Sequence, residues 1–291
     1  MAVHETLATR PRYRLTVRGE SRLLGARTWV MGILNVTPDS FSDGGRFAAA
    51  DAAIAQGLMQ FEAGADVVDV GGESTRPGAD PTSAEEEIRR VCPAISGLRQ
   101  RGAGLLSVDT TKAAVARAAL DAGADIVNDV SGFRFDPELA RVVAAAGVPA
   151  VLMHVRGEFA TMHRDPHYRD VVAEVGSELR GCIEIARAAG VAADRILLDP
   201  GIGFAKNAEH SLEIVRRLAE LHALGRPLLV GPSRKSFLGK VLDAPVDGRL
   251  FGTAAAVAAC VLAGAHVVRV HDVKEMTQVA RVCDAILGEA A

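Results

Sequence analysis

Short apolar runs alternate along the chain with longer segments in which apolar residues recur at helical spacing. Runs of this kind, without regular polar alternation, are typical of parallel strands that are buried on both faces. The segments between them are long enough to form helices, so the sequence predicts a mostly parallel sheet built from βα units. The predicted strands are Val30–Leu34, Val67–Gly71, Leu105–Asp109, Ile126–Asp129, Ala150–His154, Ile196–Asp199, Leu228–Gly231 and Val267–His271.

Glycine stands at the end of many of the predicted helices, shortly before the next strand. Glycine tolerates the left-handed conformation in which many helices end. These glycines are Gly64, Gly123, Gly147, Gly190 and Gly264. Eight βα units without a linker or a change in composition favour an α/β fold with a single (β/α)8 TIM barrel. A doubly wound open sheet is the alternative, but it would usually show fewer strands or a change in the pattern.

The residues before the first barrel strand follow a different pattern. Residues 1–11 are predicted to form a flexible leader, and residues 12–291 a single domain. From Tyr13 to Thr28 the pattern alternates around Gly19-Glu20, which predicts a β-hairpin. We expect this N-terminal hairpin to cover the closed end of the barrel.

The overall composition excludes several classes of function. A formal net charge of -3 gives no electrostatic basis for binding nucleic acid or an anionic membrane. The apolar stretches are too short to span a bilayer, and the first residues lack the order of a signal peptide. The cysteines have no metal-ligand spacing, which favours reduced thiols in a cytoplasmic protein. They are Cys92, Cys182, Cys260 and Cys283.

Polar or ionisable residues stand where the predicted strands end. In a barrel these ends form one rim, and active sites lie there. An Asp or Asn at one strand end is by itself a common turn residue. Such residues at nearly every strand end predict a functional site at the rim. The strand ends carry Asn35, the segment 71–76, Asp109, Asn128, Asp129, Met153, His154, Asp199, the segment 231–235, Arg269 and His271.

Two carboxylates directly follow apolar strands, at Asp109 and Asp199. An ionised carboxylate in a partly dry barrel mouth needs hydrogen-bond donors, and a flat heterocycle with adjacent N–H groups would supply them. Asn128 has both a donor and an acceptor with which to bind a neighbouring ring edge. The structural alternatives are an N-cap role for Asp109 and a turn at Asp199-Pro200.

Basic residues at the last two strands could bind an anion. Arg269 and His271 alternate on one strand and therefore share a face, while Lys235 lies in the seventh loop, where barrels often bind phosphate. Together with Asn35 and Arg76, the residues of the last strand could surround a phosphate or pyrophosphate. The alternatives are a solvated helix start for Lys235 and an ion pair across the barrel for Arg269.

Two long polar loops follow the first two strands, at residues 37–45 and 72–80. We expect both loops to be mobile and exposed in the resting protein, although the second could be a plain connector. His154, His163 and His167 lack the helical spacing of a zinc pair and are expected to be surface or supporting residues.

Taken together, these motifs resemble the dihydropteroate synthase family, folate-pathway enzymes that are inhibited by sulfonamides. The similarity runs from about Thr28 to the C-terminus. It is carried by the segments Gly32–Gly44, Asp69–Gly78, Ser107–Thr110, Asn128–Ser131, Leu198–Lys206, Ser233–Ser236 and Arg269–His271, in the same order.

The resemblance implies a (β/α)8 barrel that joins 6-hydroxymethyl-7,8-dihydropterin diphosphate to p-aminobenzoate, giving 7,8-dihydropteroate and pyrophosphate. In such a reaction the diphosphate leaves, a stabilised pterin cation forms, and the amine attacks it. The resemblance also implies Mg2+ as cofactor and a homodimer, for which the late helices at Thr253–Leu262 and Val273–Leu287 could supply the interface.

The resemblance assigns residues to three subsites and to catalysis. It assigns pterin binding to Asp109, Asn128, Met153, Asp199, Phe204, Gly231 and Lys235. It assigns diphosphate binding to Asn35, Arg76, Arg269 and His271, and Asn35 is also expected to bind Mg2+. It assigns p-aminobenzoate binding to Phe41, Thr75, Arg76, Pro77 and Ser236. It assigns catalysis to Asp109, Lys235, Arg269 and His271.

The sequence departs from the family pattern in two places. The segment after His154 lacks a Met and a Pro that are common in the family, and Pro232 replaces a smaller residue. Two other functions are alternatives. A methyltetrahydrofolate–corrinoid methyltransferase would not need the anion site of Asn35, Arg269 and His271. A non-catalytic pterin-binding paralogue would have lost Asn35, Asp109, Lys235 or Arg269, and all four are present.

Overall fold

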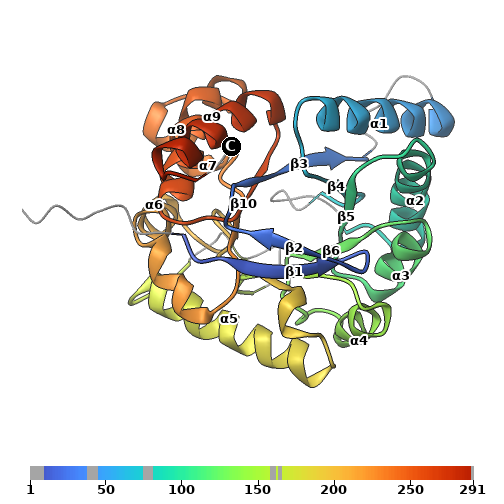
Figure 1. Ribbon diagram of the computed structural model, residues 1–291, viewed down its shortest axis with the longest axis horizontal. Coiled ribbons are helices and arrows are strands. Elements are labelled where there is room, and N and C mark those ends of the chain that lie inside the picture. The colour runs from blue at the N-terminus through green and yellow to red at the C-terminus, as the bar shows by residue number, and fades with distance from the viewer. Residues whose placement is uncertain (1–9, 38–44, 75–80, 158–161, 163–165, 290–291) are drawn as a thin grey trace, which may run out of the picture.

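The computed structural model describes residues 10–37, 45–74, 81–157, 162 and 166–289. Within these residues, eight parallel strands alternate with helices (Figure 1). The strands are β3 (Trp29–Asn35), β4 (Val67–Gly71), β5 (Leu105–Asp109), β6 (Ile126–Asp129), β7 (Ala150–Met153), β8 (Ile196–Asp199), β9 (Leu229–Val230) and β10 (Val267–Val270). The α-helices are α1 (Gly45–Glu62), α2 (Ala84–Gln100), α3 (Ala113–Asp121), α4 (Pro137–Ala146), α5 (Val171–Ala188), α6 (Ala208–Arg216), α7 (Ser236–Leu242), α8 (Leu250–Leu262) and α9 (Val273–Ile286). Short 3₁₀ helices are η2 (Ala193–Arg195), η3 (Leu218–Leu224) and η4 (Val246–Arg249).

The sheet closes on itself, which confirms the predicted TIM barrel and excludes the open sheet. Its strand order is β8-β7-β6-β5-β4-β3-β10-β9, and a parallel bridge between Leu198 and Leu228 joins its two ends. The helices form an outer ring around it. The eight predicted strands agree with the observed ones to within one or two residues at each end.

Buried apolar residues fill the space between the strands and this ring of helices. The predicted helix-end glycines allow the chain to turn from helix to strand, because all five have positive φ values between 63° and 111°. Several helices also begin with a side-chain cap. Asp136 and Asp170, for example, accept hydrogen bonds from the first backbone N–H groups of α4 and α5.

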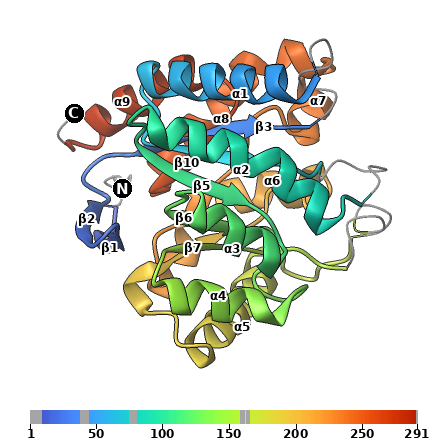
Figure 2. The same ribbon diagram turned by 90° about the vertical axis from the view of Figure 1, so that its right-hand side faces the viewer.

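The N-terminal hairpin closes one end of the barrel, as the sequence predicted. Its strands β1 (Tyr13–Val17) and β2 (Glu20–Leu24) pair in antiparallel fashion. Three of its apolar side chains, Leu15, Val17 and Leu24, pack against residues from the start of the barrel strands. In Figure 2 the hairpin lies at the left and β3 points to the right, so the C-terminal rim of the barrel is at the other end.

Part of the predicted leader is held firmly by the barrel. Arg10 is buried, forms an ion pair with Asp284 at 2.5 Å and donates to the Thr28 hydroxyl at 2.8 Å. The carbonyl of Pro11 lies 2.8 Å from the His266 imidazole. Residues 10 and 11 therefore contact the barrel through a buried, paired arginine and a backbone carbonyl, and the flexibility of residues 1–11 stays a prediction. Residues 1–9 lie outside the described residues.

Candidate active site

The rim carries a row of predicted site residues in direct register. Asn35 is paired with Gly71, Gly71 with Asp109, and Asp109 with Asn128, across strands β3 to β6. A β-carbon on Gly71 would lie 3.5 Å from that of Asp109 and 3.8 Å from the Asn35 Oδ1 atom. Side chains in register in a parallel sheet point to the same face. The register thus brings Asn35, Asp109 and Asn128 to one side of the rim.

Arg269 crosses the barrel mouth to meet two carboxylates. Its Nη2 donates to Asp109 Oδ2 at 2.6 Å, and its Nε donates to Asp69 Oδ2 at 2.6 Å. The ion pair across the barrel, which the sequence left open as an alternative, is therefore present. It places a fixed cation next to the carboxylate that was expected to bind a heterocycle.

Asp69 is a member of this site that the sequence analysis did not select. It lies in β4, one layer below the rim, and is fully buried. Besides Arg269 it accepts a 2.9 Å hydrogen bond from Asn128 Nδ2. A carboxylate can only accept, so the Asn128 amide NH2 faces Asp69 and its carbonyl oxygen is left for a ligand. The signal was present as one charged residue within the apolar strand Val67–Gly71.

Asp199 and Lys235 form the other side of the mouth. Asp199 Oδ1 accepts a 2.7 Å hydrogen bond from the Gly201 backbone, so one oxygen makes the expected turn and Oδ2 is left for a ligand. Gly201 has a φ of 69°, and a β-carbon there would lie 2.0 Å from the His154 carbonyl oxygen. Lys235 precedes α7, and its Nζ lies 4.0 Å from the centre of the Phe204 ring.

An apolar patch lies beside these charged groups. Met153 is buried in a cluster with Val130, Val155 and Met162, and Phe204 packs on its edge. Gly231 lies at the end of β9, where a β-carbon would be 3.9 Å from that of Arg269. A flat ring that entered the mouth could therefore contact apolar side chains as well as the carboxylates.

His271 is held by Ser233. The Ser233 hydroxyl accepts the His271 backbone N–H at 3.2 Å and lies 3.0 Å from the imidazole Nδ1. We assign the hydroxyl proton to that contact, which leaves the ring proton on Nε2 as a donor. Burial and the charge of Arg269 lower the pKa of His271 to about 4, so the ring is neutral at pH 7.

Burial changes the protonation of two other rim residues. It raises the pKa of Asp109 to about 7, although Arg269 acts in the opposite direction. It lowers the pKa of Lys235 to about 8, and Arg269 lowers this pKa further while Asp199 and Asp109 oppose the change. Both groups therefore titrate near neutral pH, as acid–base and binding groups of active sites often do.

Below the mouth, His154 supports the loop that carries Phe204. Its ring nitrogens lie 2.8 Å from Lys206 Nζ and 3.0 Å from Glu178 Oε2. Lys206 Nζ also donates to the Phe204 carbonyl oxygen at 2.9 Å. Both His154 and Lys206 are buried, and burial lowers the pKa of Lys206 to about 7. His154 is thus a supporting residue, as expected, whereas Lys206 was missed.

A partly buried cluster of charged residues binds the start of the loop after β4. Lys112 Nζ lies 2.7 Å from Glu73 Oε2 and 2.6 Å from Glu87 Oε2. Glu73 also accepts the Thr82 backbone N–H at 2.8 Å, which ties both ends of the loop together. Helix α3 has Lys112, and not Asp109, at its N-cap position, so the N-cap alternative for Asp109 is excluded.

Four predicted site residues, Phe41, Thr75, Arg76 and Pro77, lie outside the described residues. Most of the two long loops and residues 158–161 of the segment that departs from the family pattern also lie outside them. Ser236, the remaining residue assigned to p-aminobenzoate, is exposed at the start of α7, directly after Lys235. Pro232 is buried and leaves Lys235 directed over Phe204.

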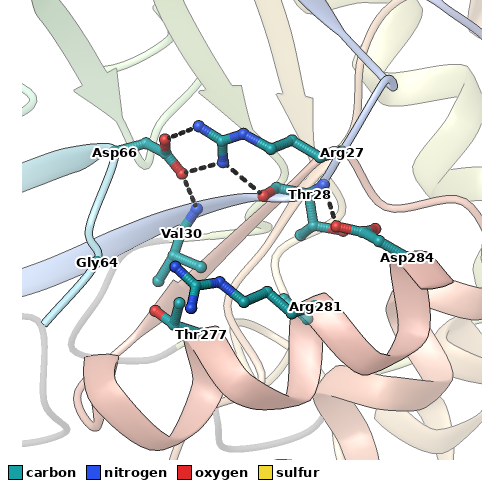
Figure 3. A pocket seen from close by; sticks show the side chains of 9 residues that line it. Arg27, Thr28, Val30, Gly64, Asp66, Thr277, Arg281 and Asp284 are labelled. Carbon is teal, nitrogen blue, oxygen red and sulfur yellow. Dashed lines mark hydrogen bonds and ion pairs between the residues drawn. The ribbon is translucent and has the colours of Figure 1, made fainter. Parts of the chain in front are cut away.

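A cavity of about 250 Å³ lies at the opposite end of the barrel, between the start of β3 and helix α9. Figure 3 shows that its acidic groups are already paired, since Asp66 binds Arg27 and the Val30 N–H, and Asp284 binds the Thr28 N–H. This cavity is distant from the rim residues and is part of the structural base of the barrel.

The described residues contain neither a cluster of metal-ligating side chains nor a single helix that could span a membrane. They contain no group of three or more His, Cys, Asp or Glu side chains that could hold a metal ion. No single helix among them is long and apolar enough to cross a membrane, and α7 with the η4–α8 segment reaches that length only as a pair bent by 87°.

The chain was compared with known proteins. The family model described as "Pterin binding enzyme" matches residues 31–271. The dihydropteroate synthase of Synechocystis sp. is 50% identical over 263 residues, which cover 90% of this chain and 91% of the relative. The Escherichia coli K12 enzyme of the same name is 45% identical over 259 residues, covering 89% and 92%.

Solved structures agree with these relatives. The Xanthomonas albilineans dihydropteroate synthase with 4-aminobenzoic acid has a TM-score of 0.88 and 44% identity, covering 95% of this chain and 98% of that one. The same enzyme in complex with 7,8-dihydropteroate has a TM-score of 0.83 and 42% identity, covering 94% and 98%. The chain therefore belongs to the dihydropteroate synthase family of pterin-binding enzymes.

Proposed function

We propose that the protein condenses 6-hydroxymethyl-7,8-dihydropterin diphosphate with p-aminobenzoate to form 7,8-dihydropteroate and pyrophosphate. The observation that carries this proposal is the contact of Arg269 with Asp109 at the rim. It puts a carboxylate suited to a pterin ring beside a cation suited to a diphosphate. Two structures of the Xanthomonas albilineans enzyme, one with 4-aminobenzoic acid and one with 7,8-dihydropteroate, at 44% and 42% identity, support the same assignment.

The pterin ring is proposed to enter between the two sides of the mouth. Its N–H groups would donate to Asp109 and to the free Oδ2 of Asp199, and its ring edge would contact the Asn128 carbonyl. Lys235 would contact the acceptor side of the ring. Met153, Phe204 and Gly231 are proposed as the walls of this pocket, and the packing of Phe204 against the Met153 cluster and under Lys235 supports this.

The diphosphate is proposed to bind on the side of β3 and β10. Arg269 would contribute its charge, and neutral His271 would donate from Nε2. Arg76 is assigned here by family resemblance alone.

Asn35 would hold a Mg2+ ion through its side-chain oxygen, because Mg2+ often takes only one or two protein oxygens besides substrate phosphates. When bound, the ion would neutralise charge that develops on the leaving group.

The chemistry begins with cleavage of the carbon–oxygen bond to the diphosphate. Positive charge then develops on the pterin methylene and negative charge on the departing oxygen. Asp109 would stabilise the first through the conjugated ring, while Arg269 and His271 stabilise the second. The p-aminobenzoate amine then attacks the methylene carbon and releases a proton to solvent. We propose Phe41, Thr75, Arg76, Pro77 and Ser236 as the residues that hold p-aminobenzoate.

The pH dependence of kcat/KM is expected to be bell-shaped, with limbs near pH 7 and pH 8. Asp109 must be ionised to stabilise the cation, and its raised pKa means that it becomes neutral as the pH falls below about 7. Lys235 must be charged, and it loses its proton as the pH rises above about 8. The charges that act on the pKa of Asp109 are those of Arg269, Asp69, Glu87 and Asp129. The charges that act on the pKa of Lys235 are those of Arg269, Asp199 and Asp109.

Initial rates at limiting pterin diphosphate between pH 5 and 10 would test this expectation. The acidic limb should be absent from the residual activity of Asp109→Asn. An acidic limb near pH 4 in the wild-type protein would contradict the raised pKa of Asp109.

A homodimer is proposed from the exposed apolar residues of the late elements. Phe251 in α8 is 86% exposed, and Val282 and Ile286 in α9 are 60% and 58% exposed. Helices α8 and α9 lie side by side in both views. Exposed apolar patches of this kind are often buried by a second copy of the same surface.

The protein is proposed to act in the cytoplasm. Its four cysteines form no disulfide, which supports this proposal.

Replacement of Phe251 by glutamate is expected to convert the dimer to a monomer, because a charge would be buried at the interface. Light scattering during size-exclusion chromatography would measure the mass of both proteins. Leu23→Glu, at an exposed apolar residue of the hairpin, is the matched control and should remain dimeric. A wild-type monomer at micromolar concentration would refute the dimer.

The proposed reaction is tested by measuring dihydropteroate with each substrate omitted in turn. Product should require both substrates, and one pyrophosphate should be released for each dihydropteroate formed. Formation of methylated corrinoid instead, or binding of the pterin without product, would exclude the proposal.

A further inference from the structure

We infer that Asp69 is a positioning residue that orients the diphosphate-binding arginine and the pterin-binding asparagine from one oxygen atom. Its Oδ2 accepts from Arg269 Nε at 2.6 Å and from Asn128 Nδ2 at 2.9 Å. This inference rests on the proposed function, because it takes Arg269 and Asn128 as groups that bind the two ends of one substrate.

The position of Asp69 excludes direct contact with the substrate. It is fully buried in β4, two residues before Gly71, whereas Asp109 and Arg269 are 16% and 19% exposed at the mouth. Its other oxygen, Oδ1, is buried and has no hydrogen-bond partner among the described residues. All of its polar contacts are therefore directed to the two ligand-binding side chains above it.

Asp69 matters most when the substrate is bound. In the free protein Arg269 has two carboxylate partners, Asp69 and Asp109. When Asp109 accepts hydrogen bonds from the pterin, its contact with Arg269 weakens, and Asp69 remains as the fixed partner. A charge-assisted hydrogen bond to Nε restricts the plane of the guanidinium, and the Nη groups then face the diphosphate.

The same oxygen fixes Asn128. Because Asp69 can only accept, it holds the amide NH2 downward and the amide carbonyl toward the ring. Without this constraint the amide could rotate by half a turn and present a donor to the pterin N–H group. Asp69 thus determines the hydrogen-bond polarity of Asn128 as well as the orientation of Arg269.

The test uses Asp69→Asn, which keeps the shape of the side chain and removes its charge. Binding would be measured by calorimetry with two separate probes, inorganic pyrophosphate and 6-hydroxymethylpterin. Each affinity is expected to fall about tenfold, because both ligand-binding side chains lose a charged hydrogen-bond partner. Asp125→Asn is the matched control, because Asp125 is also buried and bound to an arginine, Arg99, but directly precedes β6 and so lies at the end of the barrel opposite the rim.

A double substitution separates positioning from a general loss of stability. In the background of Arg269→Lys, Asp69→Asn should change pyrophosphate affinity by less than about twofold, since the residue acts through Arg269. Unchanged affinity for either probe in Asp69→Asn, an equal loss in Asp125→Asn, or additive effects with Arg269→Lys would overturn the inference. So would wild-type protein that fails to bind pyrophosphate.

These binding results are independent of turnover. If wild-type protein forms dihydropteroate while Asp69→Asn binds both probes normally, the positioning role fails and the proposed function stands. If no dihydropteroate forms but both affinities fall as expected, the proposed function fails and the positioning role stands.

Discussion

Replacement of Asp109 by asparagine is expected to lower kcat by about a hundredfold to a thousandfold, with little change in thermal stability. The carboxylate is needed to stabilise positive charge on the pterin, and removing one such electrostatic contact typically has an effect of about this size. The fold should survive because Arg269 keeps its 2.6 Å ion pair with Asp69.

Single-turnover rates and thermal unfolding of Asp109→Asn would measure the two parts of this expectation. If Asp109 served only to hold Arg269, the variant would lose stability and diphosphate affinity but keep a normal rate at saturating substrate. A near-wild-type rate in a folded Asp109→Asn protein would remove Asp109 from the mechanism.

Replacement of Lys235 by methionine is expected to lower kcat/KM for the pterin diphosphate by about a hundredfold. Methionine keeps the apolar stem, which packs closely enough that a β-carbon on Gly203 would lie 3.2 Å from Lys235 Cδ. It removes the charged group above the Phe204 ring. The main loss is expected in KM, since Lys235 would contact the pterin before and during bond cleavage.

Lys240→Met is the matched control, because Lys240 lies on helix α7, which Lys235 directly precedes, and is exposed. Its steady-state constants should equal those of the wild type. Equal constants in Lys235→Met would show that Lys235 is only a solvated residue at the start of a helix, the alternative that its sequence position left open.

The sequence predicted the barrel and its rim well because both depend on local patterns. An apolar run that ends in a polar residue identifies a buried strand and its C-terminal end. The glycines at the helix ends are equally local, and Gly64 and Gly123 have the positive φ values expected of them. The shortest strand, β9, was also predicted, because Leu228, Leu229 and Val230 form an apolar run, and all three side chains are buried in the structure.

The sequence could not predict which polar groups meet. Asp69 and Arg269 are 200 residues apart, and their contact depends on the register of β4 and β10 around the closed barrel. Lys206 meets His154 for the same reason, through the loop after β8. A pattern of apolar positions defines the face on which a side chain lies, but not the partner that compensates its buried charge.

The most direct test of the proposed mechanism concerns the order of bond cleavage and attack. Single-turnover rates of dihydropteroate formation would be measured at saturating concentrations of p-aminobenzoates with ring substituents that vary the basicity of the amine. If the diphosphate leaves first to give a cation held by Asp109, the rate should not depend on amine basicity. A rate that rises steadily with amine basicity would show that the amine displaces the diphosphate directly, and would contradict a discrete pterin cation.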